Sequence, residues 1–216
     1  MSMDMPEDVV GVLLAGGKSS RMGGGDKCLL PLGGQPMLAH IIDRLRPQVS
    51  DLVINANGDV ARFAAFDLPV IDDRLEGQAG PLAGVHAGIE WARSNRPRSR
   101  FIVTAATDTP FFPADLIARF RAAIGDAEPR LLVARSEEGV HPVFGLWPVS
   151  LAPALEASVK NGMRKVQAWV ADHDAEQIFF PAMEIGGRKV DPFFNINRPE
   201  DLAEANALLA AEPVRG

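Results

Sequence analysis

A glycine-rich segment near the start of the chain has the composition of a phosphate-binding loop. Residues 14–27 contain five glycines and three cations, Lys18, Arg21 and Lys27, directly after an apolar run. Glycines let the backbone approach a ligand closely and point its N–H groups at oxygens, while arginine binds two oxygens at once and lysine adds a point charge. A turn without a ligand is the alternative, but it needs neither this length nor these cations. The segment therefore predicts a polyphosphate site.

Several familiar catalytic motifs are absent from the sequence. The glycine-rich segment has neither Walker A spacing nor a G-x-G-x-x-G fingerprint, which argues against P-loop proteins and dinucleotide-binding dehydrogenases. The four histidines lie far apart and Cys28 is the single cysteine, so we expect no zinc or iron–sulfur site. Hydrolase chemistry has little support, because no G-x-S-x-G elbow occurs.

Asp108 is the candidate ligand for a magnesium ion. It follows an apolar run, and carboxylate oxygens are the hard ligands that Mg2+ prefers, with water and nucleotide oxygens in the remaining positions. Asp108 could instead cap the helix expected near Pro113, but it lies several residues before that helix. Phosphoryl transfer through such groups needs no protein nucleophile, because catalysis rests on holding two anions close and stabilising the developing charge.

Asn55 and the pair Asp72-Asp73 are candidates for recognition of a base. An aspartate can accept two hydrogen bonds from guanine N1–H and N2–H2, so one of these acids can select a purine. Two other interpretations stay open. Adjacent acids on a loop are often only solvated, and Asn55 at a strand end can form a local Asx turn.

Alternating strands and helices must position these residues. Short apolar runs predict four buried strands, at residues 9–14, 52–54, 68–71 and 101–105. Helical patterns lie between them, which predicts an α/β fold with a three-layer α/β/α arrangement and a mainly parallel, Rossmann-like sheet. The rhythm loosens after residue 131, where we expect an antiparallel strand or a small β-ribbon. We expect a single domain over residues 1–216.

The carboxyl ends of the predicted strands bring the candidate residues together. Open parallel sheets bind ligands outside these ends, and each of the four runs is followed by glycine or polar residues. We therefore expect four segments, which begin at Gly16, Asn55, Asp72 and Asp108, to converge on one rim of the sheet.

Composition and charge exclude several classes of partner. The formal charge of −6 argues against a general nucleic-acid surface, and the longest apolar run is too short to span a bilayer. The first eight residues carry three acids and no Lys or Arg, unlike a secretory signal. With its single cysteine, the chain fits a reducing cytoplasm, and we expect a cytoplasmic protein that binds neither nucleic acid nor membrane.

A resemblance to a known family covers nearly the whole chain. The run Leu-Ala-Gly-Gly-Lys-Ser-Ser-Arg-Met-Gly followed by Asp26-Lys27 resembles the signature loop of nucleotidyltransferases that activate sugars, alditols or pterins. Its Gly-Gly-Lys form is most similar to the molybdenum cofactor guanylyltransferases. Further matching segments follow in order, at residues 55–57, 71–73, 80–84, 107–110, 141–142 and 194–202.

This resemblance implies a reaction and a set of nucleotide-binding residues. The reaction is transfer of GMP from MgGTP to molybdopterin carrying molybdenum, which gives the guanine dinucleotide cofactor and pyrophosphate, on a fold of the nucleotide-diphospho-sugar transferase type. The family pattern assigns the guanosine part to Leu14, Ala15, Gly16, Asn55 and Asp73. It assigns the triphosphate to Lys27 and Arg21 and the magnesium ion to Asp108, which makes these three the expected catalytic residues.

The resemblance places the acceptor in the C-terminal part of the chain. Asn195 and Asn197 alternate in an extended segment, so both amides point to one face. Many nucleotidyltransferases have a metal-binding aspartate there, and the neutral amides of this chain are therefore assigned to the pterin phosphate or ring. Arg164 and Lys165 correspond to a basic pair of the family that can meet the pterin phosphate. A charged helix start is the alternative for that pair.

The partners expected from the resemblance are GTP and molybdopterin or Mo-molybdopterin, and also molybdenum-insertion proteins and molybdoenzyme chaperones. Two other functions remain in competition. One keeps the chemistry but changes the substrate, as in a molybdopterin cytidylyltransferase or a sugar- or alditol-phosphate nucleotidyltransferase. The other is a nucleotide-binding partner protein that delivers the cofactor without catalysis, which has no need of a metal ligand such as Asp108.

Overall fold

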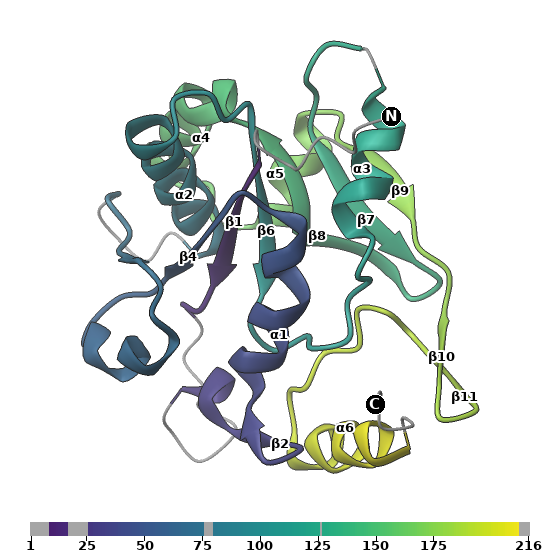
Figure 1. Ribbon diagram of the computed structural model, residues 1–216. Helices are drawn as coiled ribbons and strands as arrows, with labels where there is room; N and C mark the ends of the chain where they lie inside the picture. The colour runs from purple at the N-terminus through teal and green to yellow at the C-terminus, as the bar shows by residue number, and fades with distance from the viewer. Residues whose placement is uncertain (1–8, 17–25, 76–79, 126, 212–216) are drawn as a thin grey trace.

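The computed structural model describes residues 9–16, 26–75, 80–125 and 127–211. Its centre is a seven-stranded sheet with strand order β5-β4-β1-β6-β8-β7-β9 (Figure 1). The strands are β1 (Val9–Leu14), β4 (Asp51–Asn55), β5 (Val70–Ile71), β6 (Phe101–Ala106), β7 (Leu132–Ser136), β8 (Gly139–Pro148) and β9 (Glu176–Phe179). β8 is antiparallel to both of its neighbours, and the other pairs are parallel. This confirms the predicted mainly parallel sheet with an antiparallel strand in the C-terminal half.

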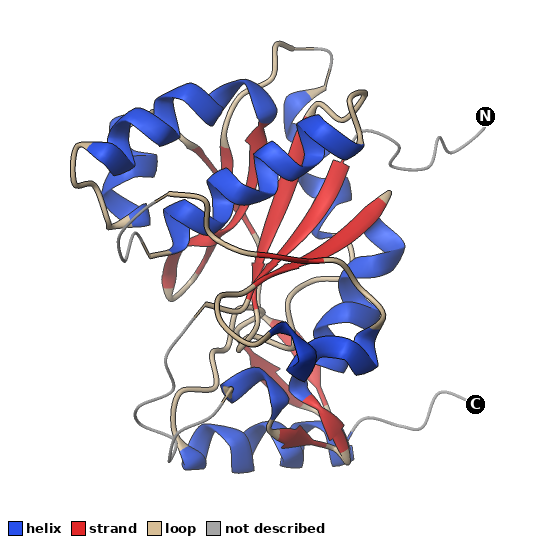
Figure 2. Ribbon diagram, turned by 90° about the vertical axis from the view of Figure 1, so that its left-hand side faces the viewer, coloured by secondary structure: helices blue, strands red, loops and turns tan. Residues whose placement is uncertain are grey.

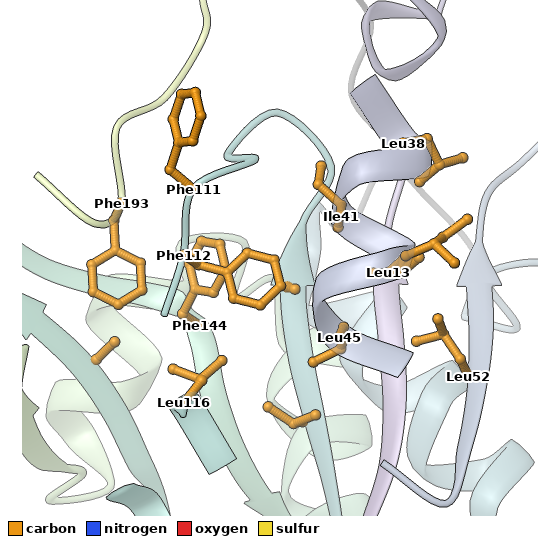
Figure 3. Close-up of a cluster of buried hydrophobic side chains, with 14 of the residues drawn as sticks. Leu13, Leu38, Ile41, Leu45, Leu52, Phe111, Phe112, Leu116, Phe144 and Phe193 are labelled. Atoms are coloured by element: carbon orange, nitrogen blue, oxygen red, sulfur yellow. The ribbon is translucent and has the colours of Figure 1, made fainter. Parts of the chain in front are cut away.

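Helices lie on both sides of the strands (Figure 2). They are α1 (Met37–Leu45), α2 (Pro81–Asn95), α3 (Leu116–Ile124), α4 (Ala152–Lys160) and α5 (Val166–Asp172). Their apolar residues form two separate cores, one with α1 and α3 and the other with α2, α4 and α5. Side chains alternate along each strand, so Leu13 of β1 enters the first core (Figure 3) while Val10 and Val12 enter the second. The result is the predicted three-layer α/β/α arrangement.

Small elements gather near the carboxyl ends of the central strands. They are the hairpin β2 (Pro31–Leu32) and β3 (Gln35–Pro36), the ribbon β10 (Met183–Ile185) and β11 (Arg188–Val190), and α6 (Pro199–Ala211). In Figure 1, α6 lies along the lower end of the molecule, near β2 and the ribbon. The Gly33 N–H donates to Asn206 Oδ1 of α6 over 2.9 Å, which ties the hairpin to the C-terminal helix. The small antiparallel ribbon predicted for the C-terminal half is confirmed.

Short 3-10 helices complete the structure, at η1 (Lys27–Leu29), η2 (Arg46–Gln48), η3 (Val60–Phe66) and η4 (Val149–Leu151). The predicted strand at residues 68–71 is shorter in the structure, where only Val70 and Ile71 pair with β4. Pro69 has no N–H to donate, which limits this edge strand. Gly33 and Gly34 have positive φ angles of 58° and 87° and form the two-residue turn between β2 and β3. Within the described ranges, no helix is long and apolar enough to cross a membrane.

Candidate functional site

Three side chains from two other segments, those of Asp108, Asn195 and Asn197, surround the ammonium group of Lys27, and we refer to the four residues as the Lys27 cluster. Lys27 Nζ donates to Asp108 Oδ2 over 2.8 Å and to Asn197 Oδ1 over 2.7 Å. Asn195 Oδ1 lies 3.5 Å from the same nitrogen. The Lys27 and Asp108 side chains are 14% and 26% exposed, so the ion pair is partly shielded yet open to a ligand. The structure thus collects one cation and three oxygen atoms that accept its hydrogen bonds at one point.

Backbone contacts fix the segments that carry this cluster. The Ile196 N–H donates to the Asp108 carbonyl oxygen over 2.9 Å, which joins the C-terminal segment to the residues after β6. The Thr107 hydroxyl donates to the Leu14 carbonyl oxygen over 3.2 Å, which links the ends of β6 and β1. These hydrogen bonds fix the segment with the two asparagines relative to Asp108, and the residues after β6 relative to the end of β1.

Cys28, the residue that follows Lys27, is buried and anchors η1. Cys28 is 3% exposed and lies close to the Thr107 side chain. Burial, with the nearby Asp26 charge, raises the pKa of the Cys28 thiol to about 11. The thiol is therefore neutral near pH 7 and acts as a small buried anchor for η1.

Asn55, Asn57 and Asp73 form a second group at the ends of β4 and β5, which we call the Asp73 cluster. The Asn55 amide donates to Asp73 Oδ1 over 3.0 Å, and the Asn57 amide donates to Asp73 Oδ2 over 2.8 Å. Asn57 Oδ1 also accepts from the Asp73 N–H over 3.0 Å. Each carboxylate oxygen therefore has one neutral donor and keeps lone pairs for a further donor.

Gly84 of α2 makes room for Asn55. A Cβ at position 84 would lie 2.3 Å from Asn55 Oδ1 and 2.7 Å from Leu14 Cδ2, which is closer than a real Cβ approaches another atom. Any other residue there would push the Asn55 side chain away from Asp73. The Ala15 N–H donates to the Asn55 carbonyl oxygen over 2.8 Å, so the end of β1 lies beside the same cluster.

The predicted basic pair lies on the same rim, next to the start of α2. A Cβ at Gly80 would lie 3.3 Å from the Arg164 carbonyl oxygen, which places residues 80 and 164 side by side. Arg164 and Lys165 are both exposed. Arg164 Nη1 donates to the carbonyl oxygens of Val159 and Met163 over 2.8 and 2.9 Å, so this guanidinium caps the end of α4 in the structure.

The structure brings most predicted site residues to one rim. Leu14 is the last residue of β1, and Ala15 and Gly16 follow it. β1 lies between β4, which leads to the Asp73 cluster, and β6, which leads to Asp108 of the Lys27 cluster. Arg21 lies outside the described residues. Asn57 was not among the predicted site residues, although its position two residues after Asn55 in an extended segment would have placed both amides on one side. Thr107 was also missed, because no pattern shows that its hydroxyl reaches another strand.

Comparison with known proteins identifies the family of this chain. The model of the MobA-like NTP transferase domain matches residues 11–177. A molybdenum cofactor guanylyltransferase of Bradyrhizobium sp. (strain ORS 278) is 47% identical over 205 residues, which cover 94% of both chains. The protein of the same name from Mesorhizobium japonicum is 47% identical over 95% of this chain and 98% of its own. The chain belongs to the molybdenum cofactor guanylyltransferase family.

A solved structure agrees with the fold of this guanylyltransferase family member. Molybdopterin-guanine dinucleotide biosynthesis protein A from Archaeoglobus fulgidus matches with a TM-score of 0.67 and 20% identity, over 93% of this chain and 98% of that protein. Family membership makes the chain a nucleotidyltransferase. The Lys27 cluster combines residues inside the matched domain with Asn195 and Asn197 beyond it.

Proposed function

We propose that this nucleotidyltransferase transfers GMP from GTP to the terminal phosphate of Mo-molybdopterin, which forms the guanine dinucleotide cofactor and releases pyrophosphate. The names of the relatives at 47% identity support the choice of reaction. The structural observation that carries the proposal is the Lys27 ammonium held by Asp108 and Asn197 at the rim that also bears the Asp73 cluster. One group of residues can then bind the base and the other can handle the phosphates.

Recognition of guanine is assigned to the Asp73 cluster. The amides of Asn55 and Asn57 orient the Asp73 carboxylate, whose free lone pairs can accept hydrogen bonds from guanine N1–H and N2–H2. Cytosine offers one amino donor beside the N3 acceptor, so one carboxylate oxygen would face a lone pair. This difference favours GTP over CTP, and Leu14, Ala15 and Gly16 complete the proposed guanosine site.

The Asp108 carboxylate fits a magnesium ion. Its Oδ2 is a hard ligand oxygen that already holds a cation, the ammonium of Lys27. Asp108 would hold Mg2+, and nucleotide oxygens and water suit the remaining positions. When bound, the ion neutralises charge on the phosphates and polarises the α-phosphoryl group.

The chain's own residues position the reactants and stabilise charge. A terminal phosphate oxygen of the pterin forms a bond to the α-phosphorus of GTP, and the bond from that phosphorus to the bridging oxygen breaks as pyrophosphate leaves. Lys27 and Arg21 are assigned to the triphosphate, where cations stabilise the charge that builds on the transferred and leaving oxygens. Asn195, Asn197, Arg164 and Lys165 are assigned to the pterin phosphate or ring. Arg164 has to leave its contacts on α4 to do so.

The cellular setting remains a prediction from the sequence. We place the reaction in the cytoplasm and retain molybdenum-insertion proteins and molybdoenzyme chaperones as partners. The Cys28 thiol, buried and unpaired with another cysteine, suits a reducing compartment.

The direct test uses purified protein, Mo-molybdopterin, Mg2+ and GTP labelled at the α-phosphate. The proposal expects label in the dinucleotide cofactor and one pyrophosphate per cofactor formed. CTP replacing GTP as the better substrate would change the assigned base. Nucleotide binding without pyrophosphate release would instead support a binding partner that lacks catalysis.

A further inference from the structure

The Arg62 side chain connects the two clusters of the site. Its Nε lies 2.6 Å from Oδ2 of Asp26, and Asp26 is the residue directly before Lys27 in the chain. Its Nη2 donates to the Asn57 carbonyl oxygen over 2.9 Å, and its Nη1 donates to the Asp59 carbonyl oxygen. One guanidinium therefore touches the residue that precedes Lys27 and a member of the Asp73 cluster.

The helix η3 holds Arg62 firmly in this place. The Asp59 side chain caps η3 by accepting from the Ala61 N–H over 2.9 Å. The next residue, Phe63, is 1% exposed and packs in the first core, while the Arg62 guanidinium lies 4.6 Å from its ring centroid. The backbone on both sides of Arg62 is thus anchored, so its guanidinium has few alternative positions.

Asp26 uses its carboxylate for Arg62 in place of a cap. It occupies the N-cap position of η1, where an aspartate commonly accepts a hydrogen bond from a helix N–H, but its side chain makes no such bond. The Arg62 and Asp26 side chains are 22% and 25% exposed, respectively. A partly buried carboxylate that lost its cation would remain as an unbalanced negative charge next to Lys27.

That charge would act on the substrate of the proposed reaction. A triphosphate that contacts Lys27 would meet the Asp26 carboxylate one residue away, and like charges repel more strongly where solvent is partly excluded. Arg62 neutralises Asp26 and, by holding the Asn57 carbonyl, keeps the phosphate side and the base side at one separation.

We propose that Arg62 is a positioning residue for the nucleotide, which fixes η1 and Lys27 relative to the Asp73 cluster and cancels the charge of Asp26. This inference rests on the proposed function, because it assumes that the Asp73 cluster binds the base and that Lys27 binds the phosphates. Arg62 is not assigned to contact the nucleotide. It acts on the site through its contacts with Asp26 and with the Asn57 carbonyl oxygen.

The test measures binding of GTP and of guanosine with Mg2+ by calorimetry in the full-length protein. The variants are Arg62→Ala, Arg62→Lys, Asp26→Asn and the double variant Arg62→Ala/Asp26→Asn. Arg93→Ala is the matched control, because Arg93 pairs with Glu90 three residues away within the same helix, α2. Thermal unfolding of each variant reports the fraction that is folded.

Arg62→Ala is expected to weaken GTP binding about 10-fold and guanosine binding less than about threefold, because the uncovered charge acts on phosphate. Asp26→Asn added to Arg62→Ala should restore at least half of that loss on a logarithmic scale. Arg62→Lys should give an intermediate loss, since lysine keeps the charge but cannot reach both partners with a fork. The control should bind GTP like the wild type.

Three results would overturn the proposal: equal losses for GTP and guanosine, no rescue by Asp26→Asn, or an Arg62→Ala effect below threefold. If Arg62→Ala does not fold, Arg62→Lys and the double variant carry the same comparison. If the wild type prefers CTP, the proposed guanine specificity fails, and the series repeated with CTP and cytidine still tests Arg62. These outcomes distinguish a failure of the proposed role of Arg62 from a failure of the proposed function.

Discussion

The two carboxylates at the rim of the sheet have different partners. Neutral amides 16 and 18 residues away in the sequence hold Asp73, whereas a lysine 81 residues away holds Asp108. Asp73 keeps its negative charge for neutral hydrogen-bond donors such as the edge of a base. Asp108 is already paired with a cation, so it can exchange one cation for another. The comparison supports the proposed division of base selection and charge handling between two clusters on a single rim.

Loss of Asp108 should break the charge-handling side and give the largest effect. Asp108→Ala leaves the Lys27 ammonium without its carboxylate partner and removes the proposed Mg2+ ligand, so turnover should fall by about 10^3-fold. Pyrophosphate release at saturating GTP measures this. Asp108→Asn, which keeps the size of the side chain, should fall nearly as far. A loss below tenfold in both variants would remove Asp108 from the metal site.

Lys27→Ala should have the next largest effect. Turnover is expected to drop on the order of 10^2 or more, because a cation that acts on the transition state is lost while Asp108 and the asparagines remain. Single-turnover rates, compared with the affinity for GTP, distinguish a catalytic loss from a binding loss. An effect below about threefold would contradict a role in the transition state.

Asp73→Asn should affect base selection and leave charge handling intact. The amide replaces one acceptor oxygen with a donor, which should weaken GTP binding by about 10- to 100-fold, as expected for hydrogen bonds to a charged group, with little change for CTP. The neighbouring Asp72 is exposed and makes a suitable control as Asp72→Asn. Equal effects of the two substitutions would contradict the assignment of Asp73 to the base.

Asn197→Asp is designed to separate the acceptor from the nucleotide. It places a negative charge beside the proposed pterin phosphate, so the KM for Mo-molybdopterin should rise by about 3- to 10-fold and more than the KM for GTP. Initial rates with each substrate varied in turn provide the measurement. Similar increases for both substrates would move Asn197 to the nucleotide side.

The smallest effect concerns stability and the anchor of Lys27. Burial raises the pKa of Cys28 to about 11 from the usual 9.0, so the folded state keeps a proton that the unfolded state loses first. The contribution to the free energy of unfolding is therefore complete below pH 9 and is lost as the pH rises toward 11. Urea unfolding at pH 8 and pH 10 should show a smaller decline for Cys28→Ala than for the wild type. An equal decline would place the pH dependence elsewhere.

Local patterns and the family resemblance predicted much of the fold, all four residues of the Lys27 cluster and two of the three residues of the Asp73 cluster. The apolar runs marked β1, β4 and β6, and the polar residues after them correctly indicated one rim, because carboxyl ends of parallel strands share an edge. The two-residue β5 was overestimated because the pattern ignored the missing N–H of Pro69.

Long-range contacts were beyond this reasoning. Nothing in the sequence shows that the Lys27 ammonium lies between Asp108 and Asn197, since that contact spans 170 residues and depends on the path of the C-terminal segment. The role of Arg62 was equally hidden, because a lone arginine in a connection is usually solvated and only its contacts with Asp26 and Asn57 distinguish it.

The division between base selection and charge handling is tested most directly by calorimetry of GTP, CTP, ATP and UTP with Mg2+, on the wild type and on Asp73→Ala. The account predicts that the wild type binds GTP most tightly and that Asp73→Ala loses this preference while it still binds nucleoside triphosphates through the Lys27 cluster. Equal or tighter binding of CTP by the wild type, or an unchanged preference for GTP in Asp73→Ala, would contradict it.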